Sequence, residues 1–474
     1  MSRRERIVLI LLLAAQAGLV LYLFWQSVPM RPKRPVLTVL TLPLEQVHAR
    51  FSPYGPGVEQ ESVMLFCRRY GFTPRWVSAA TWQEAGDLLL AGKADLLVAP
   101  GIMSHDLADD PMVRSGPAYE EHFPVFIHNQ YRFGLDSPYS MCDKPVVVTD
   151  NPRLLESMQR EIRDIPCEPQ VEVWEEFSLR GILKTLSRNL LKLVLVDSGR
   201  FRYWEPFFPE LRRTQDLNRP VAYRWHWRTD QPDIDEALKA FWKRFPDSRD
   251  FQDIRELYTG FLPRLMDYYE INHLASTIEQ KLPQFQEPII TAARAHGLDP
   301  LLVVALIYQE SRFEPLATSR TGVRGLMQIT RDTAQHLGLE DRLDPVSSIE
   351  AGCRYLRDIW ERFEGKGLPR WERWFLTLTA YNQGYNHTLD AMLLAEELDK
   401  DPARWSDMKT VFPMLSYSKY YSRLQWGYAR GFEAVDFVES IRFYYYLLQG
   451  FVVLGRPEAQ HLAPMLEARP GSWP

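Results

Sequence analysis

The hydrophobic pattern of this chain changes once, near Phe261, and that change constrains the fold more than any other feature of the sequence. Before it, short apolar runs alternate with amphipathic segments. After it, apolar residues recur at helical spacing and strand-like runs disappear. A chain of 474 residues is also too long for one compact core. We therefore expect an α/β part followed by an all-α part.

Units of helix, turn and strand repeat in the first part of the chain, between residues 36 and 258. Helices with capping residues precede apolar runs of strand length. Strands connected by helices in this order usually pair in parallel. We therefore predict two α/β lobes with mostly parallel sheets, with strands at 36–42, 96–99 and 193–196 and helices at 58–70, 81–91 and 178–189.

The N-terminal residues have the pattern of a membrane-targeting segment. Arg3, Arg4 and Arg6 precede an apolar run at residues 7–24, which only Gln16 interrupts. Such a run is close to the roughly 20 residues that span a bilayer. Cleavage near residue 17 would leave an apolar end, which favours an uncleaved anchor. Residues 1–35 are therefore predicted to be a signal or membrane anchor with a Pro- and Arg-rich tether.

Composition excludes several classes of function. The net charge of -5 comes from 56 basic and 61 acidic residues in mixed order, which gives no basic patch for nucleic acid. No metal-ligand motif or phosphate loop is present, so no metal and no cofactor are expected. The four cysteines lack CxxC spacing and are interpreted as buried thiols, with a Cys142–Cys167 disulfide as the alternative in an oxidising compartment.

One helix of the second part carries a candidate catalytic acid. Asp299 and Pro300 predict the start of a helix over 300–313, and Pro315 predicts its end. This helix is apolar almost all round, which indicates a core helix. Glu310 falls on the face of its apolar residues, so burial should raise the pKa of its carboxyl. A raised pKa suits a general acid at neutral pH.

Three short motifs follow in order from this residue. Ser311 directly follows Glu310, then comes Gly325-Leu326-Met327-Gln328, and later Ala380-Tyr381-Asn382. In this order and at these separations, the motifs closely resemble the lysozyme-like lytic transglycosylases. The resemblance covers residues 282–449, and the N-terminal segment with its following domain is similar to the membrane-bound members of that family.

The resemblance implies a mechanism with one carboxyl group, that of Glu310. It protonates the glycosidic oxygen between N-acetylmuramic acid and N-acetylglucosamine of peptidoglycan, and the acetamido group supports the cationic sugar. The same glutamate then takes the proton of the C6 hydroxyl, which closes a 1,6-anhydro ring without water. The resemblance places glycan-binding positions at Ser311, Gly325, Leu326, Met327, Gln328, Tyr381, Asn382 and Phe437.

The residue types suggest separate tasks within these motifs. Gly322 and Gly325 allow the backbone to pack closely around a cleft. Gln328 and Asn382 can form hydrogen bonds with acetamido and hydroxyl groups. Met327 and Tyr381 suit either a sugar face or the protein core.

One position departs from the family pattern. Phe437 stands where the family generally carries a tyrosine whose phenol reaches the catalytic glutamate, so Tyr444 or Tyr428 is a candidate substitute. Two alternatives to a lytic transglycosylase remain open. The first is a lysozyme-type muramidase on the same fold, and the second is a non-catalytic envelope sensor that binds solute and peptidoglycan.

The stretch 36–258 resembles the periplasmic solute-binding fold of the amino-acid-binding type. That family holds the ligand carboxylate with an arginine in a loop where this chain has Ser104-His105-Asp106, and Arg114 is interpreted as a solvated loop residue. A small ligand other than a free amino acid is therefore expected.

The predicted order is anchor and tether at 1–35, a two-lobed α/β solute-binding-like domain at 36–258, a helical linker at 259–281, an all-α lysozyme-like catalytic domain of the α+β superfamily at 282–450 and a tail at 451–474. From the N-terminal segment and the resemblance, we expect the protein to lie on the periplasmic side of a bacterial cell envelope and to be associated with a membrane.

Overall fold

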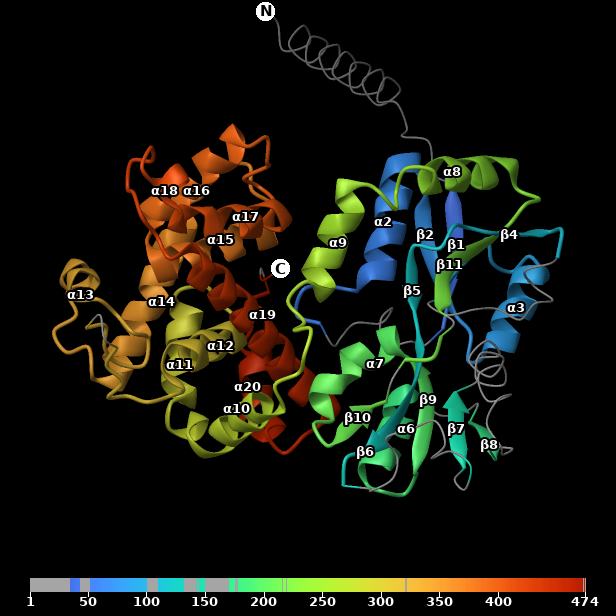
Figure 1. The fold of residues 1–474 in the computed structure, drawn as a ribbon, viewed down its shortest axis with the longest axis horizontal. Coiled ribbons are helices and arrows are strands. Elements are labelled where there is room, and N and C mark those ends of the chain that lie inside the picture. The colour runs from blue at the N-terminus through green and yellow to red at the C-terminus, as the bar shows by residue number, and fades with distance from the viewer. Residues whose placement is uncertain are drawn as a thin grey trace, which may run out of the picture.

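Two mixed sheets form the N-terminal half and helices form the C-terminal half, as the computed structural model shows in Figure 1. The structure describes residues 35–42, 52–99, 110–131, 142, 145–149, 170–174, 178–214, 216–218, 220–319, 322–471 and 473. The predicted anchor and the Ser104-His105-Asp106 loop lie outside these residues. Within them, no single helix is long and apolar enough to cross a membrane, although one pair of helices bent by 118°, Gln286–Ala295 and Pro300–Ser311, passes by length and composition.

The first lobe is built on the sheet β2-β1-β3-β11-β4, with β5 paired to β11. Apolar residues alternate along its strands, so Leu37 and Val39 pack on one face while Leu40 packs on the other. Its strands are β1 (Val36–Thr41), β2 (Thr73–Ser78), β3 (Leu96–Ala99), β4 (Val113–Ser115), β5 (Glu120–His122) and β11 (Val221–Arg228). Its helices are α2 (Val58–Tyr70), α3 (Trp82–Leu90), α8 (Pro232–Trp242) and α9 (Arg249–Thr259).

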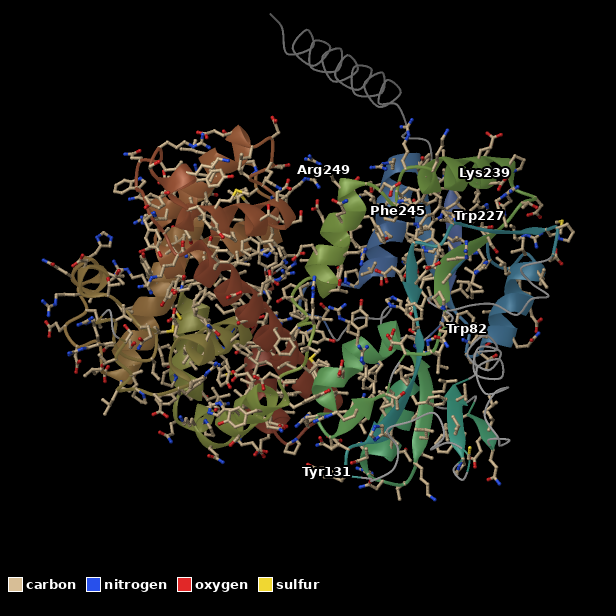
Figure 2. All side chains as sticks on the ribbon, in the orientation of Figure 1. Trp82, Tyr131, Trp227, Lys239, Phe245 and Arg249 are labelled. Atoms are coloured by element: carbon tan, nitrogen blue, oxygen red, sulfur yellow. The ribbon has the colours of Figure 1, made fainter. Side chains whose placement is uncertain are left out.

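Aromatic side chains fill the first lobe between its sheet and its helices. Trp227 and Phe245, labelled in Figure 2, are buried in this lobe. Arg114 lies in β4, where its Nε donates to Oδ1 of Asp235 at 2.8 Å. Arg114 is thus a strand residue rather than a loop residue, although its side chain is 42% exposed as expected for a solvated arginine.

The second lobe is built on the sheet β10-β6-β9-β7-β8. The chain enters it between β5 and β6 and leaves it between β10 and β11, so two connections join the lobes. Its elements are β6 (Pro124–Asn129), β7 (Val146–Thr149), β8 (Val171–Trp174), β9 (Leu193–Asp197), β10 (Leu211–Arg213), α6 (Leu179–Ser187), α7 (Ser198–Trp204) and the 3-10 turn η3 (Glu205–Phe207).

The prediction of mostly parallel sheets is correct for only part of each lobe. β1 pairs in parallel with β2 and β3, and β7 does so with β8 and β9. The strands next to the lobe connections run antiparallel: β11 to β3, and β6 to β9. Helices separate β1, β2 and β3 along the chain, and this order predicts parallel pairing. No helix separates β5 from β6, so the sequence there predicts neither parallel nor antiparallel pairing.

The cysteines divide into two kinds. Cys67 and Cys353 are free and buried, as expected. Cys142 is disulfide-bonded, so the interpretation of all four cysteines as buried thiols is wrong, and Cys167 lies outside the described residues.

The helical half centres on α12 and the long helix α19, which pack against each other. Its helices are α10 (Tyr268–Gln280), α11 (Gln286–Ala295), α12 (Pro300–Ser311), α13 (Arg331–Leu337), α14 (Pro345–Arg362), α15 (Arg370–Gln383), α16 (Tyr385–Glu397), α17 (Trp405–Val411), α18 (Ser418–Tyr421), α19 (Gly431–Leu454) and α20 (Ala459–Glu467). Two 3-10 turns, η4 (Leu282–Gln284) and η5 (Phe412–Ser416), connect them.

Three features of this half differ from the sequence predictions. The apolar residues after Phe261 precede the first helix rather than form it, since α10 begins at Tyr268 and Leu265 is 88% exposed. α12 ends at Ser311 because Arg312 adopts a left-handed φ of 53°. The expected tail instead contains the end of α19 and all of α20, and it packs into the core through Leu462, Met465 and Trp473.

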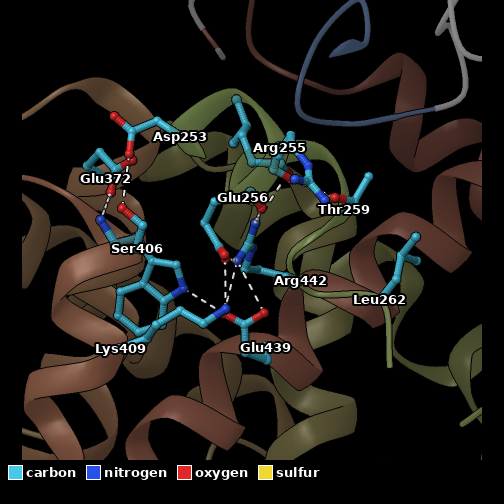
Figure 3. Close-up of polar contacts among 12 residues, drawn as sticks. Asp253, Arg255, Glu256, Thr259, Leu262, Glu372, Ser406, Lys409, Glu439 and Arg442 are labelled. Carbon is cyan, nitrogen blue, oxygen red and sulfur yellow. Dashed lines mark hydrogen bonds and ion pairs between the residues drawn. The ribbon is translucent and has the colours of Figure 1, made fainter. Parts of the chain in front are cut away.

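The two halves meet through α9 and the helices α17 and α19. Arg442 of α19 is buried, and its Nη1 donates at 2.9 Å both to Glu256 of α9 and to Glu439 (Figure 3). Ser406 of α17 donates to Asp253 at 3.0 Å. The contact between the halves is therefore polar and largely enclosed.

A second contact brings the N-terminal half into the helical half. Tyr54 precedes α2 and is 4% exposed. Its hydroxyl donates to the carbonyl of Arg442 at 2.8 Å, and Trp371 Nε1 donates to its carbonyl at 3.1 Å. Its ring lies 5.1 Å from that of Phe261 and 6.0 Å from that of Tyr445. The side chain of Tyr54 is thus part of the core of the helical half.

Candidate active site

α12 is fixed at its first turn by a buried cap. Asp299 accepts from Leu301 N at 2.7 Å and from the hydroxyl of Tyr445 at 2.6 Å, and Arg469 pairs with the same carboxylate. Burial raises the pKa of Asp299, while the Arg469 charge opposes that rise. Because Tyr445 lies in α19 and Arg469 follows α20, the expected tail helps to position α12.

Glu310 lies in the last turn of α12, at the wall of a cavity of about 490 Å³. Burial alone raises the pKa of its carboxyl to about 8. The direction of this shift agrees with the sequence prediction, while Glu310 as a whole is half-buried, unlike the buried residues at 300–308 of α12. The carboxyl is therefore mostly protonated at neutral pH, which is the state that a general acid needs.

The cavity is lined by segments that lie far apart in the sequence. It is the size of an ordinary ligand site. Besides Glu310, its lining comes from the loop before α13, from the α15–α16 junction and from the start of α19. The lining residues are Glu310, Val323, Gln328, Thr330, Tyr381, Asn382, Gln383, His387, Tyr428, Ala429, Arg430 and Glu433.

Gln328 closes a tight turn and holds it with its side chain. It adopts a left-handed φ of 46°, and its Nε2 donates to Gly325 O at 2.8 Å and to Ala317 O at 3.2 Å. Tyr381 supports the same turn because its hydroxyl donates to Met327 O at 2.8 Å. Burial, followed by the charge of Glu310, raises the pKa of Tyr381 well above its usual value, so its phenol stays protonated beside the acid.

Five of the predicted glycan-binding residues do not line this cavity. Ser311 donates back to Ile307 O at 3.2 Å, and Leu326, Met327 and Phe437 are buried. Of the two roles left open for Met327, the structure shows core packing, because its side chain packs against Gly352. Gly325, the fifth, provides only backbone to the turn. These residues contribute to the packing around the cavity and not to its lining.

Of the two candidates for the missing phenol at Phe437, only one lines the cavity. The hydroxyl of Tyr444 donates to Glu270 at 2.8 Å and accepts from Arg312 at 3.2 Å, which ties it to the first helix of this half. Tyr428 is 55% exposed and lines the cavity together with Glu310. Tyr428 is therefore the phenol available to a bound ligand.

Sequence reasoning missed seven lining residues, and four of these carry long polar or ionisable side chains. Gln383 and His387 follow Asn382 closely, while Arg430 and Glu433 surround the start of α19. The only sequence signal was that polar side chains continue directly after the Ala380-Tyr381-Asn382 motif. Glu433 is a second carboxylate in the cavity, largely exposed and 3.4 Å from Arg430. Within the described parts of the chain, no group of three or more His, Cys, Asp or Glu residues could hold a metal ion.

Replacing Gly325 by alanine is expected to destabilise this turn strongly. Gly325 has a φ of 81°, and an added Cβ would lie 1.9 Å from the carbonyl oxygen of Arg342. Gly338 has a similar φ of 69° with nothing near its Cβ position. We expect Gly338→Ala to cost about 1–2 kcal/mol and Gly325→Ala at least about 2 kcal/mol more, measured by thermal unfolding. Equal costs would contradict the close approach of Arg342.

Comparison with known proteins gives matches over both halves. A family model described as "Transglycosylase SLT domain" matches residues 287–403. A protein of Pectobacterium atrosepticum named membrane-bound lytic murein transglycosylase F is 31% identical over 450 residues, covering 90% of each chain. A protein of the same name from Shewanella sediminis is 32% identical over 431 residues, covering 88% of this chain and 86% of the relative.

Two solved structures illustrate the likeness of the N-terminal half to known folds. The GluR0 ligand-binding core in complex with L-glutamate covers 47% of this chain and 97% of its own, with a TM-score of 0.40 and 13% identity. An ancestral arginine-binding protein bound to arginine covers 48% of this chain and 100% of its own, with a TM-score of 0.41 and 14% identity.

Proposed function

Because this chain belongs to the membrane-bound lytic murein transglycosylase F family, we propose that it cleaves peptidoglycan between N-acetylmuramic acid and N-acetylglucosamine without water, leaving 1,6-anhydro ends. The observation that carries this proposal is the raised pKa of Glu310 at the wall of the cavity. A carboxyl that stays protonated near pH 7 can deliver a proton to the glycosidic oxygen.

The single carboxyl of Glu310 serves both steps of this reaction. In the first step, its proton passes to the glycosidic oxygen, the C1–O bond breaks and the substrate's acetamido group supports the cationic sugar. In the second step, the carboxylate accepts the proton of the C6 hydroxyl, and the C6 oxygen bonds to C1. The proton returns to Glu310, and no water is consumed.

The lining residues provide the contacts that hold a strand in this position. Asn382 is exposed in the cavity and offers both a donor and an acceptor. Tyr381 is held close to Glu310, and Tyr428 offers a partly exposed ring. Gln328 also lines the cavity, with its amide nitrogen engaged in the turn. Five further positions hold the backbone that carries these lining residues in place: Ser311, Gly325, Leu326, Met327 and Phe437.

Glu433 gives a second candidate function, a muramidase that uses water. Glycoside hydrolases normally place two carboxylates around the bond, and Glu433 lines the cavity that contains Glu310. Mass spectrometry of soluble products from isolated peptidoglycan separates the two reactions. Anhydromuropeptides support the lytic transglycosylase, whereas reducing ends that incorporate oxygen from labelled water establish the hydrolase.

The pH dependence of cleavage should follow the titration of Glu310. Since the acid must be protonated and its pKa is about 8, kcat/KM should be level near neutral pH and fall about tenfold per pH unit above that value. An acid with the ordinary value of 4.5 would lose activity from pH 5 upward instead. Initial rates of product release in constant ionic strength test this, and a decline that begins below pH 6 would contradict it.

The proposed location is the periplasmic face of a membrane in the bacterial cell envelope, reached through the N-terminal segment. The substrate lies in that compartment, and a disulfide-bonded Cys142 fits oxidising surroundings. The two-lobed domain is proposed to take a small envelope ligand other than a free amino acid. Protease accessibility of the full chain in spheroplasts tests the orientation.

A further inference from the structure

His387 lines the catalytic cavity from a helix that begins after a sharp change of direction. Gly384 separates α15 from α16 and has a φ of 92°, a conformation that favours glycine. His387 lies in the first turn of α16 and shares the cavity with Glu310. No step of the proposed reaction uses it.

The two ring nitrogens of His387 lie in different surroundings. Nδ1 is buried and has no hydrogen-bond partner among the described residues. Nε2 is not buried in this way, and within the same parts of the chain it has no protein partner either. Because the residue lines the cavity, Nε2 is the nitrogen that a ligand can reach.

This asymmetry favours one neutral tautomer. A proton on Nδ1 would bury an N–H group without an acceptor, and unpaired buried donors are rare in folded proteins. A proton on Nε2 instead places the N–H group where water or a ligand oxygen can accept it. The neighbouring Gln383 does not pair with Nδ1 in this structure. Its Nε2 donates to the carbonyl of Arg430, and its buried Oε1 has no hydrogen-bond partner among the described residues, so it does not accept a proton from this ring.

We propose that His387 carries a proton on Nε2 and donates a hydrogen bond from this nitrogen to an oxygen of the bound glycan strand, beside Glu310. The identity of the ligand rests on the proposed function. Hydroxyl and acetamido oxygens are abundant along such a strand. Asn382 and the partly exposed ring of Tyr428 line the same cavity and suit the same sugars. His387 would therefore bind and orient substrate without exchanging a proton with it.

Two substitutions distinguish the nitrogens of the ring. Glutamine can place an N–H group near the position of imidazole Nε2, whereas asparagine reaches only the position of Nδ1. We expect His387→Gln to bind glycan strands within about threefold of the parent, and His387→Asn and His387→Ala to bind about tenfold more weakly. His461→Ala, on α20 and outside the cavity, is the matched control and should change nothing.

Binding is measured with the full chain in detergent, in a Glu310→Gln background that prevents turnover, by calorimetry with peptide-free glycan strands. Equal affinities for the parent, His387→Asn and His387→Ala would overturn the inference, as would rescue by asparagine rather than glutamine. A different result would contradict the proposed function alone. In that case the chain with Glu310 intact releases no anhydro products, while glycan strands still bind and the binding still depends on His387.

A spectroscopic measurement tests the tautomer directly. Nitrogen-15 shifts of the chain labelled on histidine, compared with those of His387→Gln, identify the signals of this ring. Protonation on Nε2 supports the inference, and a shift of that N–H signal when strands are added supports the contact. Protonation on Nδ1 would overturn it.

Discussion

Replacing Glu310 by glutamine is expected to reduce the release of anhydromuropeptides by at least about a thousandfold, because the amide keeps the shape of the side chain and has no acidic proton. The measurement is the initial rate of product release from isolated peptidoglycan. Glu314→Gln is the matched control, since Glu314 lies four residues later, is 60% exposed and pairs with Lys281 at the surface. It should retain nearly full activity.

Glu433→Gln separates the mechanisms within the same experiment. A reaction with one carboxyl predicts that this variant still gives anhydro products at a rate within about tenfold of the parent. A reaction with two carboxylates predicts that it loses activity as severely as Glu310→Gln. The second result would replace the transglycosylase proposal by the muramidase.

The same Glu310→Gln substitution should make the protein more stable. A carboxyl whose pKa is raised from 4.5 to about 8 on folding supports the fold fully below pH 4.5, and this support is lost as the pH rises toward 8. Glutamine removes that loss, so we expect a gain on the order of 2 kcal/mol at pH 7, shrinking to less than about 1 kcal/mol at pH 5. Thermal unfolding at the two pH values tests it, and a gain independent of pH would contradict the buried acid.

Replacing Arg442 by methionine is expected to cost about 3–5 kcal/mol, because it leaves two carboxylates near a buried site without their main cation. Arg442 is 1% exposed and donates to Glu256 and Glu439, and its Nη2 donates to the carbonyl of Glu256 at 2.6 Å (Figure 3). Lys409 lies 2.9 Å from Glu256 and compensates only in part. For a chain of this length the midpoint of thermal unfolding should fall by roughly 3–5 °C.

Two further variants make this result interpretable. Arg423→Met removes an arginine from a surface pair with Glu397, both 50% exposed, and should cost less than about 1 kcal/mol. Adding Glu256→Gln to Arg442→Met should recover part of the loss, since one uncompensated charge disappears. If Arg442→Met costs no more than Arg423→Met, the enclosed contact between the halves is not formed in solution.

The sequence predicted best those features that depend on neighbours along the chain. The cap at Asp299 and the buried face that carries Glu310 both follow from residues within one helix. The end of that helix was missed because Arg312 and Phe313 adopt left-handed conformations that their residue types do not signal. The helix bounds near Tyr70, Gly338 and Gly384 follow from glycines that are visible in the sequence.

The cavity itself could be predicted only in part. The family resemblance in motif order and spacing indicated Gln328, Tyr381 and Asn382, but that spacing does not say which side chains face a ligand. Met327 packs beside Gly352 and Phe437 is buried, and both placements depend on tertiary packing. His387, Arg430 and Glu433 reach the cavity through the α15–α16 junction and the start of α19, whose relative placement no local pattern encodes.

The insertion of Tyr54 into the helical half limits how these two halves can be recombined. An excised C-terminal fragment would lack the ring that packs against Phe261, Trp371 and Tyr445, and it would expose that aromatic surface to water. It would also lose the α9 partner of Arg442. A different α/β domain can therefore be grafted onto the helical half only if Tyr54, Glu256 and their immediate neighbours stay with that half. The unit that can be exchanged does not coincide with the domain boundary seen along the sequence.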